Sequence, residues 1–133
     1  MKKITILHVL FAMTVMACLV GCNGQVALTG KVTYTDGSPV QVGQVVFSDE
    51  NYGFRGPIDK NGHYKLGGNY EGDGIRPGKY NVYLVETVTM APDENGHPKM
   101  TTHVALKYTD PKTSELTCEV KGKMTFDFTV EKP

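Results

Sequence analysis

From residue 26 to residue 131, apolar and polar residues alternate in short runs, and no stretch has a helical period longer than a turn or two. Alternation with a period of two is typical of a strand that buries one face. The first run covers residues 26–34 and places Val26, Leu28 and Val32 on the same face. A turn at residues 36–39 then ends this strand, because Gly accepts a positive φ and Pro does not continue a strand.

The next segments predict an inner strand, an edge strand and a tight turn. Val45 and Phe47 are expected to face the core from one strand. Residues 51–58 predict a weaker strand at a sheet edge, because Pro57 has no N–H to donate to a ladder. Residues 59–62, Asp-Lys-Asn-Gly, predict a hairpin turn before a strand at 63–66.

Two glycine- and proline-containing segments divide the second half of the chain. Residues 67–78 hold five glycines and one proline and predict a loop, which leads into residues 79–89, the longest expected strand. Residues 91–103 predict a second long loop, of a length that is usually functional or mobile. A short pairing is expected at 104–106.

The last expected strands alternate in the same way. Leu116, Cys118 and Val120 share one face, and a hairpin at Gly122 is expected to lead into a strand at 124–130. About seven short strands, with turn signals every eight to twelve residues, predict an all-β fold. We expect a single immunoglobulin-like antiparallel β-sandwich.

The first 22 residues have the order of a secretory signal. Lys2 and Lys3 precede a mostly apolar run at 4–20. The segment Leu19-Val20-Gly21-Cys22 then resembles the bacterial lipobox. This resemblance implies that residues 1–21 are removed, that Cys22 carries a diacylglyceryl group, and that residues 22–25 form a short tether. An uncleaved transmembrane helix is the alternative, because the apolar run is at the lower limit of spanning length.

Composition limits the remaining possibilities. Without residues 1–21, the 133-residue chain keeps 112 residues, which is one domain with a modest core. Without Lys2 and Lys3, 12 basic residues face 14 acidic ones, so nucleic acid is not an expected partner. Cys18 would leave with the signal and Cys22 would carry lipid, so Cys118 has no cysteine to pair with.

Several segments resemble the carboxypeptidase regulatory-like domain, which is a transthyretin-like sandwich. They are residues 30–32, 36–40, 43–47, 59–64 and 77–82. The tail, residues 107–117 and 125–128, is similar to small lipoproteins of this type in planctomycete-like bacteria. The resemblance covers about residues 26–131 and implies a folding, spacing or adhesion module without chemistry of its own.

The sequence contains no complete catalytic or metal-binding motif. Some transthyretin-like proteins are hydroxyisourate hydrolases with paired histidines, an arginine and a Tyr-Arg-Gly-Ser end, whereas this chain ends in Glu131-Lys132-Pro133. Asp59 and Asn61 could begin a calcium loop, but the later carboxylates are missing.

The remaining chemistry-bearing residues indicate no reaction. His63, His97 and His103 lack the spacing of a zinc site. Cys118 lies on an apolar face and is expected to be buried and not nucleophilic. We therefore expect no catalytic activity, no cofactor and no metal.

Two non-catalytic roles fit the sequence. In the first, a lipid-anchored module of the cell envelope, facing the periplasm or the exterior, offers a strand edge or loop to another envelope protein. In the second, the module binds polysaccharide through Tyr52, Tyr70 and Tyr83, which are expected in loops or on outward strand positions together with Phe54. These rings could instead cover the second sheet or an open edge.

Overall fold

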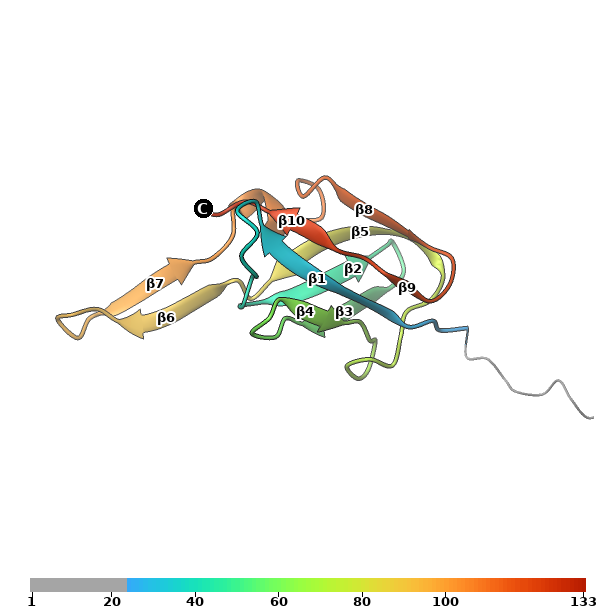
Figure 1. The fold of residues 1–133 in the computed structure, drawn as a ribbon, viewed down its shortest axis with the longest axis horizontal. Helices are drawn as coiled ribbons and strands as arrows, with labels where there is room; N and C mark the ends of the chain where they lie inside the picture. Colours follow the sequence, from blue (N-terminus) through green and yellow to red (C-terminus); the bar gives the residue numbers. More distant parts are fainter. Residues whose placement is uncertain (1–23) are drawn as a thin grey trace, which may run out of the picture.

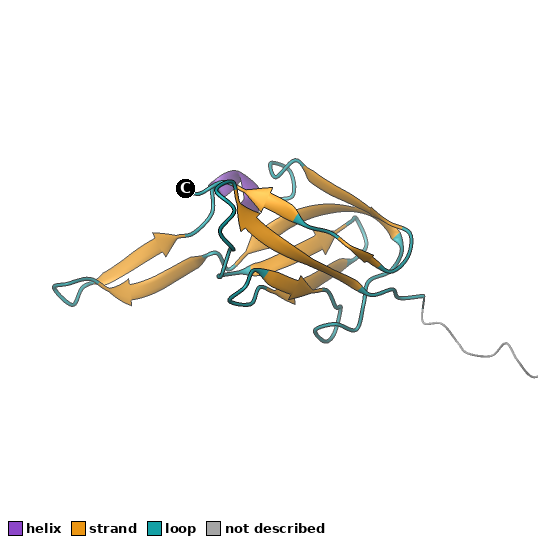
Figure 2. Cartoon of the chain, in the orientation of Figure 1, coloured by secondary structure: helices purple, strands orange, loops and turns teal. Residues whose placement is uncertain are grey.

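The structure is a computed structural model that describes residues 24–133. It confirms the predicted all-β sandwich (Figures 1 and 2). The expected lipidation site, Cys22, and the expected signal lie outside the described residues. No helix within residues 24–133 is long and apolar enough to cross a membrane.

Residues 24–133 contain ten strands and one short 3-10 helix. The strands are β1 (Leu28–Tyr34), β2 (Gln44–Ser48), β3 (Gly53–Pro57), β4 (His63–Lys65), β5 (Gly78–Val85), β6 (Val88–Pro92), β7 (Pro98–Thr102), β8 (Leu116–Val120), β9 (Met124–Thr125) and β10 (Phe128–Val130). The 3-10 helix, η1, covers Leu106–Thr109.

Two sheets form the sandwich. In one, which we call the β1 sheet, β1 pairs antiparallel with β4 on one side and parallel with β9 and β10 on the other. In the other, which we call the β2 sheet, the strands follow the antiparallel order β3-β2-β5-β8. The predicted edge strand is confirmed, because β3, which ends at Pro57, lies at one end of this order.

The core lies between these two sheets. Val45 and Phe47 are fully buried, as predicted. Phe47 packs edge-on against Phe126 at a centroid distance of 5.7 Å, so aromatic rings from the two sheets meet directly. Phe54 was expected to be exposed and is instead 4% exposed. Its ring packs edge-on against Tyr80, because β3 turns that side of the strand inward.

The expected hairpin at Gly122 is wrong. The chain leaves β8 in the β2 sheet and crosses to the β1 sheet, where β9 and β10 run parallel to β1. Alternation places the same residues inward in either sheet, and Phe128 and Val130 are indeed buried. The pattern therefore predicts the inward face correctly but not the partner strand.

The expected loop at 91–103 is also wrong. Residues 88–102 form a hairpin, β6 and β7, and the expected long strand at 79–89 ends at Val85. Glu86 interrupts it with a φ of 55°, a left-handed conformation that an L residue adopts only at a cost. Where a short strand pairing is expected at 104–106, the Ala105 N–H donates one backbone hydrogen bond to the Glu131 carbonyl. The helix η1 then begins at Leu106.

A glycine and a tyrosine connect β1 and β4 with the segment between β9 and β10 in the β1 sheet. Gly30 is the register partner of Tyr64, whose hydroxyl reaches past it and donates to the Phe126 carbonyl at 2.5 Å. In an unbroken parallel ladder, the Lys31 N–H would donate to that carbonyl. Here the Lys31 N–H donates to Oδ1 of Asp127 instead, at 2.8 Å. A Cβ at Gly30 would overlap the Phe126 carbonyl oxygen and the Tyr64 ring.

We therefore predict that Tyr64→Phe lowers the free energy of unfolding by about 1–3 kcal/mol, because the Phe126 carbonyl loses its donor inside the sandwich. Urea unfolding followed by circular dichroism measures this change. Tyr70→Phe is the matched control, since Tyr70 is 79% exposed, and it should change the stability by less than about 0.5 kcal/mol. Equal effects of the two substitutions would contradict the role given to Tyr64.

Candidate functional site

A two-stranded hairpin projects from the sandwich. We call this hairpin, β6 and β7, the arm. In Figure 1 it extends from the end of the sandwich opposite to the start of β1. Its strands pair in register from Val88 with Thr102, through Met90 with Met100, to Pro92 with Pro98. No other described strand pairs with either edge of the arm.

One face of the arm is apolar and exposed. Side chains alternate across a strand, so the register places one set on a single face. That set is Val88, Met90, Pro92, Pro98, Met100 and Thr102. Met90 is 71% exposed and Met100 68% exposed, and the two residues are directly opposite each other. Large side chains of this kind, grouped on one exposed face, are typical of a surface that binds a partner.

The tip of the arm is a turn held by the side chain of Asp93. Oδ1 of Asp93 accepts hydrogen bonds from the backbone N–H groups of Asn95, at 2.8 Å, and His97, at 2.9 Å. Gly96 follows with a φ of 82°. The segment Asp93-Glu94-Asn95-Gly96-His97 repeats the pattern of residues 59–63, where Asp59 bonds Asn61 and His63 in the same way.

This repeated pattern is the signal that could have predicted the arm. The predicted turn at residues 59–62 is confirmed by the backbone bonds from the Asp59 N–H to the His63 carbonyl and from the Gly62 N–H to the Asp59 carbonyl. The same residue types at 93–96 imply a second hairpin, although the prolines on either side are more typical of a loop. Pro92 and Pro98 lie opposite each other next to the turn, at the end of strands whose outer edges need no donor.

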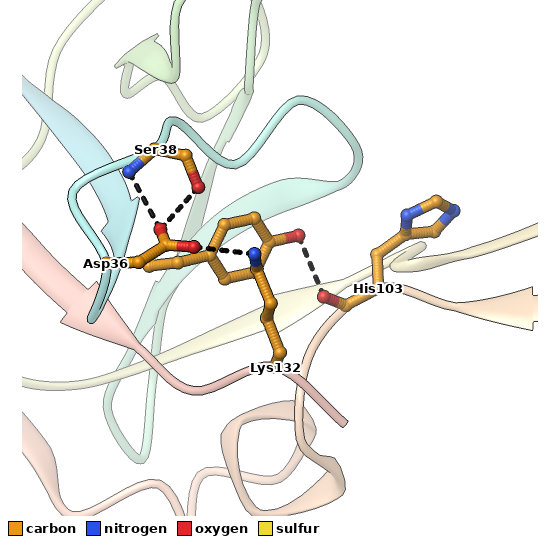
Figure 3. Close-up of polar contacts among 5 residues, drawn as sticks. Asp36, Ser38, His103 and Lys132 are labelled. Carbon is orange, nitrogen blue, oxygen red and sulfur yellow. Dashed lines mark hydrogen bonds and ion pairs between the residues drawn. The ribbon is translucent and has the colours of Figure 1, made fainter.

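The base of the arm is attached to the end of β1. The hydroxyl of Tyr34 donates to the carbonyl of His103 at 2.8 Å (Figure 3). The His103 N–H in turn donates to the carbonyl of the buried residue Thr87. Nε2 of His103 lies 2.8 Å from Oγ1 of Thr89, which belongs to β6 at the base of the arm. These bonds fix the direction in which the arm leaves the sandwich.

An ion pair beside Tyr34 joins the C-terminal segment to the first turn. Nζ of Lys132 lies 2.6 Å from Oδ2 of Asp36 and 5.1 Å from the centre of the Tyr34 ring (Figure 3). Oδ1 of Asp36 accepts from the hydroxyl and N–H of Ser38. The bonds from Lys132 and Ser38 hold the pKa of Asp36 well below its ordinary value, and Asp36 raises the pKa of Lys132.

The three candidate tyrosines lie in different settings. Tyr52 is 46% exposed, and the guanidinium of Arg76 stacks 4.5 Å from its ring centre and donates to its hydroxyl at 2.9 Å. Tyr70 is exposed in the loop before β5. Tyr83 is half-buried on the outer face of β5, beside Val46. Among the described residues, the close aromatic pairs include Tyr52 with Phe54 but neither Tyr70 nor Tyr83.

The structure places Cys118 and the three histidines in different settings. Cys118 is 6% exposed, so its predicted burial is confirmed, and burial raises the pKa of its thiol. His63 and His97 are exposed in strand and loop positions, and His103 is half-buried. Within residues 24–133, no group of three or more His, Cys, Asp or Glu side chains is placed to hold a metal ion.

The pKa shift of Asp36 predicts a dependence of stability on pH. Its pKa in the folded state lies below the ordinary value of 3.8, so the unfolded state takes up the proton first as the pH falls. The stabilisation by Lys132 is therefore complete above pH 3.8 and decreases as the pH falls toward the lower folded value. We predict that Asp36→Asn is less stable than the wild type at pH 7 and that this difference shrinks below pH 3.8.

Urea unfolding at a series of pH values measures the difference. Glu119→Gln is the control, because it removes an exposed carboxylate from β8, away from the arm. A difference between Asp36→Asn and the wild type that stays the same at all pH values would contradict the ion pair.

Comparisons with known proteins show a likeness in fold. No family model and no curated protein matches the chain. Among solved structures, the chain is similar to BcpA, the major pilin subunit of Bacillus cereus, with 14% identity and a TM-score of 0.50 over 82% of this chain and 30% of the pilin. A variant of that pilin gives 17% identity and a TM-score of 0.51, covering 81% of this chain and 30% of the variant.

A protein of the DUF3823 family from Bacteroides ovatus is 18% identical, with a TM-score of 0.46, over 81% of this chain and 45% of that protein. The chain thus spans less than half the length of each of these proteins. At such identities the likeness concerns the fold alone. The chain folds as a β-sandwich of a kind that also occurs as one part of larger bacterial proteins.

Proposed function

We propose that this protein is a lipid-anchored, non-catalytic module of the cell envelope that binds another envelope protein through the arm. We also propose that the sandwich is related to the carboxypeptidase regulatory-like domain, on the sequence segments given above. The observation that carries the function is the exposed apolar face of the arm, centred on Met90 and Met100.

A protein is the partner that suits this face. Methionine side chains are flexible and polarizable, so they pack well against apolar side chains of another protein. The outer edges of β6 and β7 add unpaired backbone groups that a strand of the partner can bond. Polysaccharide hydroxyls would gain little from methionine and proline. An isolated two-stranded hairpin is also only marginally stable in water, so a partner that covers the arm would stabilise it.

The position of the arm supports an anchored, outward-facing module. The described chain enters β1 at one end of the sandwich, and the arm leaves from the other (Figure 1). A lipid on Cys22, joined through a tether of residues 22–25, would hold the first end near the bilayer. The arm would then point away from the membrane. The likeness in fold to a major pilin subunit supports a location at the cell surface.

Photocrosslinking in intact cells tests the arm as the binding surface. A photoreactive amino acid in place of Met100 is expected to give a discrete adduct with one other protein, because this position lies on the apolar face. The matched control is the same amino acid in place of Thr101, which is the next residue of β7 and lies on the opposite face. It should give several-fold less of that adduct.

Three results would count against this proposal. Equal adducts from the two positions would mean that the apolar face is not the contact. Absence of any adduct from position 100 would mean that no protein covers the arm. An adduct of twice the mass of the chain would identify a second copy as the partner in place of another envelope protein.

Substitution of Cys22 tests the anchor. The wild-type protein is expected to incorporate radioactive fatty acid and to have a mass that lacks residues 1–21, whereas Cys22→Ser should incorporate none. Cys118→Ser is the control, because Cys118 is buried in the sandwich and should leave the label unchanged. Undiminished labelling of Cys22→Ser, or a wild-type mass that still includes residue 1, would favour the uncleaved helix.

A further inference from the structure

A polar depression lies on the outer face of the β1 sheet. Its volume is about 400 Å³. Side chains of β1, β4, β9 and the segment before β10 point into it, because alternate residues of these strands face away from the core. These outward residues are Thr29, Lys31, His63, Lys65, Thr125 and Asp127. Asp59 and Glu71 add carboxylates at its border.

Strand register arranges these side chains in two rows. Thr29 has Lys65 on one side and Thr125 on the other. Lys31 has His63 as its register partner on β4, and its backbone N–H bonds Asp127 on the opposite side. Hydrogen-bond donors and acceptors therefore lie side by side on neighbouring segments of the sheet, whose strands are spaced by roughly 4.8 Å.

The charged groups in the depression are held apart. Among the described residues, Lys31, His63 and Lys65 take part in none of the ion pairs within 4.0 Å, although three carboxylates line the same depression. Backbone N–H groups fix the carboxylates of Asp59 and Asp127, each through Oδ1. The second oxygen of each accepts no hydrogen bond from a described residue.

We propose that this depression binds the hydroxyl groups of a neutral saccharide. A sugar hydroxyl both donates and accepts, so neighbouring hydroxyls can donate to the Asp59 or Asp127 carboxylate and accept from Lys31, His63 or Lys65. The methyl groups of Thr29 and Thr125 provide apolar contact for the C–H groups of the ring.

Other classes of ligand fit less well. An anionic ligand would meet Asp59, Glu71 and Asp127, and a cationic ligand would meet Lys31 and Lys65. An apolar ligand would leave all of these groups without partners at the cost of their desolvation. The hydroxyl groups of a neutral ligand can donate to the carboxylates and accept from the lysines, so a neutral polyhydroxylated ligand suits both kinds of charged group.

The depression differs from the tyrosines that the sequence favours for sugar binding. Tyr64 is the only Phe, Tyr or Trp residue among those that line it, and its side chain is 2% exposed. Without an exposed tyrosine, tryptophan or phenylalanine ring for stacking, a short saccharide should bind with a dissociation constant of about 1 mM. A polymer with many repeats would be held more firmly by anchored copies that bind it side by side.

Saturation-transfer difference NMR on the full chain, purified in detergent, tests the proposal. The probes are cellohexaose and hexa-N-acetylchitohexaose, which are neutral, and hexagalacturonate, which is acidic. We expect at least one neutral probe to bind and hexagalacturonate to bind more weakly. His63→Ala and Lys65→Ala should each weaken that binding about tenfold, since each removes a hydrogen-bonding side chain from the depression. Both residues are exposed, so neither change disturbs the core.

Lys99→Ala on the arm and Tyr83→Ala on β5 are the controls, and both should bind like the wild type. Binding by none of the probes would overturn the proposal, as would a preference for hexagalacturonate. Equal binding by wild type, His63→Ala and Lys65→Ala would overturn it too. Loss of binding in Tyr83→Ala alone would assign the saccharide to the tyrosines. None of these results depends on the arm, so the proposed protein contact is tested separately.

Discussion

The absence of a side chain at Gly30 is the condition on which the β1 sheet depends. The Tyr64 hydroxyl can reach the Phe126 carbonyl only because nothing occupies the space above Gly30. That bond, together with the bond from the Lys31 N–H to Asp127, replaces one rung of the parallel ladder. Three strands from distant parts of the sequence are therefore joined by side chains as well as by backbone. The face that carries Lys31 and Asp127 is fixed by the same exchange of partners.

The closure of the β1 sheet also determines where the other surfaces lie. Pairing of β10 with the end of β1 brings Lys132 to Asp36 and Tyr34, and Tyr34 holds the base of the arm through His103. The arm is thus attached to the C-terminal half of β1, while the chain enters the sandwich at the other end of the same strand (Figure 1). The length of β1 therefore lies between the end of the sandwich that is expected to face the membrane and the arm with its exposed apolar face.

Sequence patterns predicted the buried half of this molecule and missed what is exposed. Val45 and Phe47 alternate with residues of the outer face, so the core strands and the edge at Pro57 followed from periodicity. The arm has no buried face, and Pro92, Gly96 and Pro98 favour a loop, so its two strands were not predicted. Pairing partners were missed for a different reason, because a period of two is the same for a strand in either sheet. The polar depression requires Lys31 of β1, His63 of β4 and Asp127, which precedes β10, to meet, and no local pattern contains this arrangement. Cys22, the residue for which the sequence predicts the most specific role, lies outside the described residues.

The parallel pairing of β1 has a consequence for the order of folding. Lys31 and Asp127 are 96 residues apart, so the β1 sheet cannot close until nearly the whole chain is available. The tip of the arm, in contrast, needs only residues 93–97 and can form within microseconds. A chain that emerges from a secretion channel with its N-terminus first would therefore remain open along β1 until the last strand has crossed.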